Sequence, residues 1–180
     1  MAEISTRRLR LRTLSPECLR ASLSGDRPRA ENLLGASLPG DWPDDPELLR
    51  IRLEQVEADP TWEPWLTRVM VLSSAQRVIG VIGFHGPPGG EWLRDFAPGG
   101  VEFGYSVYPE WRRQGFAREA SQALMAWATL TAETTTFALS MSPKNEASVG
   151  LAKSLGFSKV GTWEHPARGT EHVYRFDAGD

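Results

Sequence analysis

The stretch "VEFGYSVYPEWRRQGFAREASQALMAW", residues 101–127, decides how the rest of the sequence is interpreted. Its opening, residues 101–107, is rich in β-branched and aromatic residues and predicts a strand. From residue 116 onward, apolar side chains recur at helical spacing, which predicts a helix with one apolar face. Between the two elements the chain places a glycine and two arginines. We therefore expect a strand that passes through a basic loop directly into a helix.

Upstream of this stretch, two kinds of pattern recur. "RRLRLRTL", residues 7–14, alternates arginine with leucine and predicts a half-buried strand with a basic, solvated outer face. "SPECLRASL" and "DDPELLRIRLEQVEA" each place a capping residue before a proline, which predicts two helices. The β-branched runs "RVMVLSS" and "RVIGVIGFHG" predict a hairpin.

Downstream, "TTFALSMS" predicts a strand and "NEASVGLAKSLGF" a helix, capped by Asn145 and ended by Gly156. "SKVGTWEH" and "EHVYRFDA" predict two closing strands. Residues 86–100 are rich in proline and glycine and predict a mobile loop with little regular hydrogen bonding, inserted between two strands. The order of elements is typical of a mixed α/β (α+β) sheet with helices on both faces. We expect one domain over residues 1–180.

The amino-acid composition argues against several classes of partner and metal site. The 180 residues are 41% hydrophobic and 24% charged, with a net charge of −3, which gives no support to a nucleic-acid partner. Cys18 is the only cysteine, so no internal disulfide and no cysteine-based metal cluster can form. His85, His165 and His172 lack the spacing of zinc motifs, so we interpret them as surface or strand histidines and expect no metal. With no signal sequence or apolar span, we expect a cytoplasmic protein without a membrane partner.

The loop at residues 112–117 has the chemistry of an anion site. The first turn of a helix exposes backbone N–H groups that carry partial positive charge, and phosphate binds there readily. Gly115 lets the backbone approach such a guest, Ala117 leaves room for it, and two arginines can add charge-assisted hydrogen bonds. The spacing is neither a Walker loop nor a dinucleotide-binding fingerprint. The alternative is a polar helix start with two solvated arginines.

The second helix motif, residues 145–157, gives this loop a context. Together the two segments resemble the GNAT superfamily of acetyl-CoA-dependent N-acetyltransferases. The matching positions of the two family motifs are Arg112, Gly115, Ala117, Asn145, Ser148, Gly156 and Phe157. The block at residues 101–120 and the opening "STRRLRLRTL" are similar to the RimJ/RimL-like branch, which acetylates the N-termini of ribosomal proteins.

The resemblance implies a GNAT fold, with a mixed, largely antiparallel seven-stranded sheet splayed between its fourth and fifth strands. The pantetheine arm of acetyl-CoA would pair with backbone near Ser106, Val107 and Tyr108. The pyrophosphate would rest on the basic loop. The residues of that loop are Arg112, Arg113, Gln114, Gly115, Phe116 and Ala117. Asn145 would contact the pantetheine or phosphate end of the cosubstrate, unless it is only a helix cap.

Acetyl transfer requires deprotonation of the amine, donors for the oxyanion and a proton for the leaving thiolate. Glu102 is the candidate base, directly or through water, and its alternative is a solvent-facing strand carboxylate. A backbone N–H near Val107 would serve the oxyanion. The tyrosine that many GNAT enzymes place seven residues after the motif asparagine is Ala152 here. Ser148, which matches the serine of the ribosomal-protein branch, is the candidate acid, and its alternative is a first-turn helix serine.

Three functions remain open from the sequence. The first is an acetyl-CoA-dependent N-acetyltransferase that acts on a peptide or protein N-terminus or a small amine. The second is an aminoglycoside- or polyamine-type acetyltransferase, for which the acidic residues 41–47 would line the acceptor site. The third is a non-catalytic acyl-CoA-binding domain. We expect the 86–100 loop and the helical region at 27–65 to cover the amine side, and a homodimer is left open.

Overall fold

The alternating arginines and leucines near the N-terminus form strand β2, Leu9–Thr13, in the computed structural model, which describes residues 3–179. Leu9 and Leu11 are fully buried, as the alternation predicts. A short strand, β1 (Ile4–Ser5), precedes β2 and pairs with it in antiparallel fashion. β1 lies before the predicted strand at residues 7–14 and was not predicted, so the described residues contain eight strands where seven were predicted.

The two β-branched runs form the predicted hairpin. Strand β3, Arg68–Leu72, pairs with β2 on one side and with β4, Arg77–Phe84, on the other, and all of these pairs are antiparallel. Every residue of β3 is buried. A strand that is covered along its whole length reads as a continuous apolar run, which is why its sequence shows no alternation.

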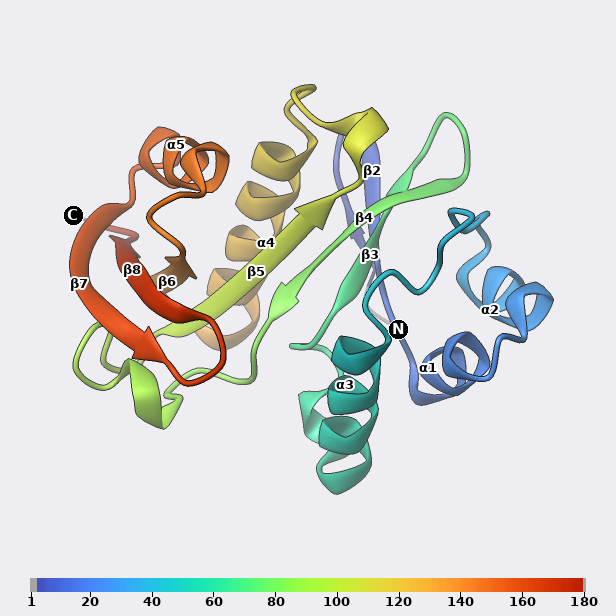
Figure 1. The fold of residues 1–180 in the computed structure, drawn as a ribbon, viewed down its shortest axis with the longest axis horizontal. Coiled ribbons are helices and arrows are strands. Elements are labelled where there is room, and N and C mark those ends of the chain that lie inside the picture. The colour runs from blue at the N-terminus through green and yellow to red at the C-terminus, as the bar shows by residue number, and fades with distance from the viewer. Residues whose placement is uncertain (1–2, 180) are drawn as a thin grey trace. The chain divides into compact units, whose positions relative to one another are not determined.

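Three helices pack beside these strands: α1 (Pro16–Leu23), α2 (Arg27–Leu34) and α3 (Pro46–Ala58). The Oγ of Ser15 accepts from the backbone N–H of Cys18, and Asp45 caps α3 in the same manner, so both predicted caps are confirmed. A one-turn helix, η1 (Pro60–Trp62), leads on to β3. In Figure 1, α1 contacts both α2 and α3. Their shared core includes Leu19, Leu34, Leu49, Val56 and Val69.

The stretch that opens the sequence analysis has the predicted structure. Strand β5 (Val101–Val107) leads through the short helix η3 (Pro109–Trp111) and the basic loop into α4 (Phe116–Ala132). Strand β6, Thr136–Met141, then runs parallel to β5. Their pairing is confined to Val101↔Phe137 and Glu102↔Ala138. Such a short ladder agrees with strands that separate soon after they begin.

The last elements are α5 (Glu146–Ser154), β7 (Ser158–His165) and β8 (Gly169–Asp177). β8 pairs antiparallel with both β6 and β7, and Figure 1 shows β7 and β8 as a long curved hairpin. Gly156, just beyond α5, has φ +90°, the left-handed conformation expected of a glycine after a helix. Phe103, Phe157 and Phe176 form a chain of aromatic contacts in the core of this region.

Residues 86–100 differ from the prediction of a loop with little regular hydrogen bonding. They contain the short helix η2, Glu91–Leu93, and backbone hydrogen bonds close the segment on itself, including Gly89 N–H to Gly100 O at 2.9 Å. Leu93 and Ala97 are buried, and Trp92 stacks on Trp163 of β7 with ring centroids 4.8 Å apart. The prediction was based on the glycines and prolines of the segment. It did not take into account that Leu93 and Ala97 lie one helical turn apart and can form a small core.

The described residues divide into two compact units. The first comprises 3–83 and 105–123, and the second comprises 84–104 and 124–179. The chain passes from one unit to the other within β4, within β5 and within α4. The strand order is β1-β2-β3-β4-β5-β6-β8-β7, a mixed and mostly antiparallel arrangement that confirms the predicted α/β class. A single domain over the whole chain stays a prediction. No helix among residues 3–179 is long and apolar enough to cross a membrane.

Candidate active site

The basic loop of the first unit has an unusual backbone. Arg113 and Gly115 both have left-handed φ angles, +62° and +80°. The first helical hydrogen bond of α4 then runs from the N–H of Glu119 to the carbonyl of Gly115 at 3.1 Å. Left-handed residues occur in the concave backbone turns that bind anions, in which successive N–H groups face one side. Because only glycine adopts φ +80° without steric cost, Gly115 is required by the loop itself.

Arg112 and Arg113 have different surroundings. The Nε of Arg112 donates to the carbonyl oxygen of Val107 at 2.8 Å, so this guanidinium ties the loop to the end of β5. Arg113 is exposed. The side-chain amide of Gln114 donates to the carbonyl of Glu110 at 3.3 Å. These bonds fix the loop's path, and a direct role of either arginine toward phosphate stays a prediction.

Arg8 supports the same loop and was missed by the sequence analysis, which described it as part of a solvated basic face. Its Nη1 donates to the carbonyl of Gln114 at 2.9 Å, and its guanidinium lies 4.3 Å from the ring centre of Phe116. The Nε is paired with Glu119 at 2.7 Å. A Cβ built on Gly115 would lie 3.5 Å from Arg8 Nη2. A third guanidinium therefore stands at the helix entrance.

Glu119 holds Arg8 in this position. Its carboxylate also accepts from the backbone N–H of Arg8 at 2.8 Å and from the hydroxyl of Thr6 at 2.6 Å. Partial burial alone would raise the pKa of this carboxyl group. The hydrogen bonds from Thr6 and Arg8, with the charge of Arg8, outweigh burial and lower the pKa below its ordinary value. The residues involved are more than a hundred positions apart, and no local pattern connects them.

At the end of β5, one edge of the strand backbone is used within the protein and the other faces away from β4. The N–H of Tyr108 donates to the carbonyl of Ile79 in β4 at 3.0 Å, so it is already used within the protein. Successive N–H groups along a strand alternate in direction, which turns the N–H of Val107 toward the opposite edge. Gly80 of β4 has no room for a side chain, because a Cβ there would lie 2.2 Å from the carbonyl oxygen of Ser106. Pairing of pantetheine with this edge stays a prediction.

In the second unit, Glu102 is buried, with 5% of its side chain exposed. The interpretation of Glu102 as a solvent-facing carboxylate is therefore wrong. Its Oε2 lies 2.7 Å from Nδ1 of His85, and its Oε1 accepts from the hydroxyl of Ser140 at 2.5 Å. Both carboxylate oxygens are engaged, and buried carboxylates are retained when they are paired in this manner.

His85 and Ser140 are the second set of residues that the sequence analysis missed. His85 directly follows β4, and its backbone N–H donates to the carbonyl of Glu102 at 3.0 Å. Ser140 lies two residues beyond Ala138, the partner of Glu102 in β6. Side chains alternate along strands, so Ala138 and Ser140 share a face. Only the pairing of three strands brings these side chains together.

The candidate residues of α5 have simpler surroundings. The side-chain oxygen of Asn145 accepts from the backbone N–H of Ser148 at 3.1 Å, so Asn145 caps the helix. Ser148 is half-buried in the first turn. A contact between Asn145 and the cosubstrate, and proton donation by Ser148, stay predictions. Among residues 3–179, no cluster of histidine, cysteine or acidic side chains is arranged to hold a metal.

Comparisons with known proteins agree with the family resemblance that the sequence motifs indicated. A family model described as an acetyltransferase (GNAT) domain matches residues 8–158, which span both units. No curated protein matches the sequence. An acetyltransferase from Agrobacterium tumefaciens is similar in structure, with a TM-score of 0.64 at 24% identity, over 98% of this chain and 94% of that one.

Two further solved structures are similar at lower identity. RimL, a ribosomal L7/L12 alpha-N-protein acetyltransferase in complex with coenzyme A, has a TM-score of 0.65 at 16% identity, over 98% of each chain. The ribosomal-protein-S5-alanine acetyltransferase from Vibrio fischeri has a TM-score of 0.66 at 16% identity, over 100% of this chain and 98% of that one. At these identities the similarity establishes the fold.

Proposed function

This chain belongs to the GNAT acetyltransferase family, and from that premise we propose that it transfers an acetyl group from acetyl-CoA to the free α-amine of a peptide or protein. The match over residues 8–158 carries the proposal. The basic loop of the first unit supports it, because its left-handed Arg113 and Gly115 suit a backbone cradle for the pyrophosphate. The residues proposed to bind the cosubstrate there are Ser106, Val107, Tyr108, Arg112, Arg113, Gln114, Gly115, Phe116 and Ala117.

The α-amine is favoured as acceptor by its chemistry. Its ordinary pKa is about 8 and that of lysine is about 10.4, so an α-amine loses its proton with less help from the enzyme. RimL and the Vibrio fischeri relative are both named for acetylating ribosomal proteins, RimL at the α-amine and the Vibrio fischeri relative at an alanine. We propose an acceptor of that class, with amine deprotonation dependent on Glu102, with Asn145 as a further contact to acetyl-CoA, and with Ser148 next to the leaving thiolate. A cytoplasmic location follows from this proposal.

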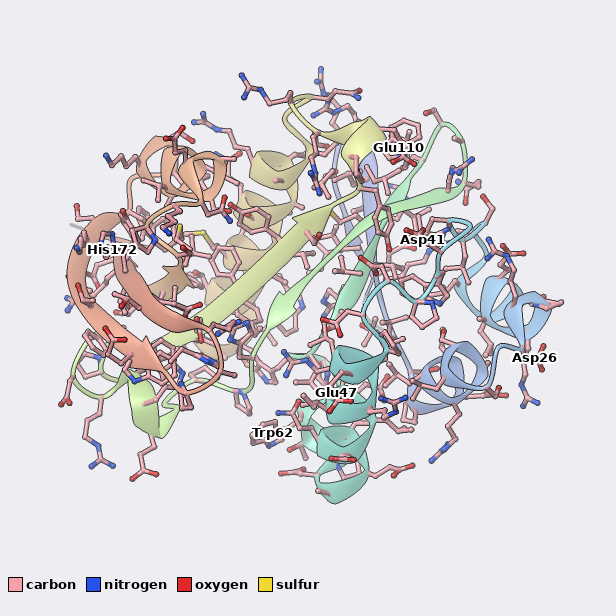
Figure 2. The ribbon with its side chains drawn as sticks, in the orientation of Figure 1. Asp26, Asp41, Glu47, Trp62, Glu110 and His172 are labelled. Atoms are coloured by element: carbon pink, nitrogen blue, oxygen red, sulfur yellow. The ribbon has the colours of Figure 1, made fainter. Side chains whose placement is uncertain are left out.

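The acidic segment at residues 41–47 gives little support to a polyamine acceptor. Asp45 is used as the cap of α3, and Glu47 pairs with Arg50 at 2.8 Å. Asp44 accepts from the hydroxyl of Tyr108 at 3.4 Å, and burial together with that carboxylate raises the pKa of Tyr108. Figure 2 shows Asp41 before α3 and Glu47 at its start. Asp44 and Asp45 are therefore already engaged within the protein, whereas the exposed Glu47–Arg50 pair holds Glu47 only weakly.

The test is release of CoA thiol from acetyl-CoA in the presence of a defined set of amines. Peptides that begin with alanine or serine are compared with the same peptides blocked at the α-amine but containing lysine, and with a polyamine and an aminoglycoside. We expect turnover with the free N-termini and at least tenfold less with the blocked peptides. Preferential turnover of the aminoglycoside would contradict the acceptor class. Binding of acetyl-CoA without turnover of any amine would instead establish a non-catalytic binding domain.

A further inference from the structure

We propose that Arg8 binds the pyrophosphate of acetyl-CoA directly through its Nη2 nitrogen, and that Glu119 acts through Arg8 as a positioning residue. The inference rests on the proposed function, because it assigns one further contact to the cosubstrate of the proposed reaction. All of the residues that carry it lie in the first unit. Neither sequence motif includes Arg8, which precedes the basic loop by more than a hundred positions.

The hydrogen bonds of Arg8 show which of its nitrogens is available to a ligand. Nε donates to the carboxylate of Glu119 at 2.7 Å, and Nη1 donates to the carbonyl oxygen of Gln114 at 2.9 Å. Each terminal nitrogen of a guanidinium carries a pair of N–H donors. Among residues 3–179, no hydrogen bond or ion pair engages Nη2, and 31% of the Arg8 side chain is exposed. The donors of Nη2 are therefore open to a ligand from solvent.

Nη2 lies beside the part of the loop that we propose as the phosphate site. A Cβ built on Gly115 would be 3.5 Å from Nη2, so this nitrogen borders the space that the glycine leaves empty. Gly115 immediately precedes α4, whose first-turn N–H groups carry partial positive charge. Backbone N–H groups at a helix start and guanidinium groups both bind phosphate well. We therefore place the Nη2 donors at the edge of the same site.

Three contacts hold the Arg8 guanidinium in this orientation. Besides its bonds to Glu119 and Gln114, it lies 4.3 Å from the ring centre of Phe116, the first residue of α4. Glu119 is itself fixed by the hydroxyl of Thr6 at 2.6 Å and by the backbone N–H of Arg8 at 2.8 Å. A guanidinium that is ordered before the ligand arrives loses less side-chain entropy on binding than a free one.

The charges of the pair give Arg8 a second effect on a bound phosphate. Glu119 lies in the first turn of α4, where an unpaired carboxylate would repel a phosphate at the same helix end. Its ion pair with Arg8, 2.7 Å long, offsets that charge. The consequence of removing the charge of Glu119 should therefore depend on whether Arg8 is present.

The decisive experiment measures acetyl-CoA affinity by calorimetry in variants at both positions. Arg8→Ala should weaken binding by about three- to tenfold. Glu119→Gln should weaken it less, because Arg8 keeps its charge and its bond to Gln114. In the Arg8→Ala background the same substitution should instead strengthen binding by about twofold, because it removes a carboxylate that has lost its partner cation.

Two further variants serve as controls for this comparison. Arg10→Ala, on β2, should keep wild-type affinity. Arg8→Lys keeps the charge but lacks the forked donors, so its affinity should fall between those of the wild type and Arg8→Ala. Urea unfolding of each variant ensures that the affinities are compared between folded proteins, and Arg8→Lys provides the comparison if Arg8→Ala does not fold.

A truncated ligand and NMR identify the contact itself. Dephospho-CoA lacks the phosphate on the ribose but retains the pyrophosphate, so Arg8→Ala should weaken its binding by the same factor. A loss confined to intact CoA would assign Arg8 to the ribose phosphate and overturn the inference. Nitrogen NMR should show a shift of the Arg8 Nη2 resonances, identified by their absence from Arg8→Lys, when CoA is added. Unchanged resonances would show that Arg8 only supports the loop, and would overturn the direct contact.

The outcomes separate this inference from the proposed function. Wild-type affinity in Arg8→Ala, or further weakening by Glu119→Gln in that background, would overturn the role of Arg8 and leave acetyl transfer intact. A wild-type protein that binds no acetyl-CoA would overturn both proposals. A protein that shows the predicted affinities but acetylates no amine would retain the contact and contradict the proposed reaction.

Discussion

The helix-entrance loop of the first unit and the Glu102 centre of the second unit are built in different ways. The loop owes its shape to the backbone, with left-handed Arg113 and Gly115 ahead of the first turn of α4. The Glu102 centre is made of side chains, a buried carboxylate held between Ser140 and His85. In our proposal the loop binds the pyrophosphate, and deprotonation of the amine depends on the Glu102 centre.

The two regions should therefore respond differently to substitution. Changes in the backbone conformation of the loop should appear as changes in acetyl-CoA affinity, with little effect on the proton-transfer step. Changes at the Glu102 centre should appear in kcat. The Arg8–Glu119 pair supports the loop, so its loss should appear in acetyl-CoA affinity as well as in stability. Loss of the core under residues 86–100 should appear in stability, because that core does not contact the reacting atoms in our proposal.

The largest expected effect is on stability, in the second unit. Leu93→Ala should lower the free energy of unfolding by about 2–5 kcal/mol, because Leu93 is 3% exposed and packs with Ala97 and Ala138. Urea unfolding measures the change. Leu130→Ala is the matched control in the same unit, since Leu130 is 87% exposed, and it should be nearly neutral. Equal effects of both substitutions would show that residues 86–100 form a loop without a core.

Gly115→Val should reduce acetyl-CoA affinity by about ten- to a hundredfold. A β-branched residue at φ +80° carries strain of about 1–3 kcal/mol, and its side chain would obstruct approach to the first-turn N–H groups. Titration calorimetry measures the affinity. Gly25→Val is the control, because Gly25 has φ +76° with no atom within 4 Å of its built Cβ. It should lose similar stability and keep wild-type affinity, and unchanged affinity in Gly115→Val would remove the loop from the binding site.

Arg8→Ala should weaken acetyl-CoA binding by about three- to tenfold, as expected when one charge-assisted contact is lost and the loop it supports becomes less ordered. Arg10→Ala is the matched control, because Arg10 lies on β2 and pairs only with Glu3, at 3.4 Å, among the described residues. Calorimetry at low and at moderate salt should show a smaller salt dependence for Arg8→Ala alone. Equal losses in both variants would indicate general charge attraction.

The smallest expected effect is a pH dependence of stability due to Glu119. Its pKa is lowered in the folded state, so its contribution is present above the ordinary value of 4.5 and is lost as the pH falls through the folded-state pKa. Glu119→Gln should therefore flatten the decline in unfolding free energy between neutral pH and about pH 3. Urea unfolding across that range measures it. A steeper decline in Glu119→Gln would contradict the sign.

The sequence by itself determined those features that depend on neighbouring residues. A left-handed φ angle after a helix, a helix cap and the alternation of a strand are local properties, so Gly156, Asn145 and the buried leucines of β2 could all be assigned from their immediate neighbours. The combination of two such motifs was enough to predict the family and the fold class. The segment at residues 86–100 shows the limit of local patterns. Its proline and glycine content led to the prediction of a loop, although its apolar residues are spaced to form a small core.

Only the tertiary structure decided which distant side chains meet. Glu102 faces His85 because β4 leads into a backbone hydrogen bond with β5, and it faces Ser140 because β6 pairs with β5 at Ala138. A shift of one residue in either register would turn these side chains to the other face of the sheet. Arg8 reaches Glu119 across 111 positions of the chain. Registers and long-range pairings are set by packing of the whole core, which no short stretch of sequence contains.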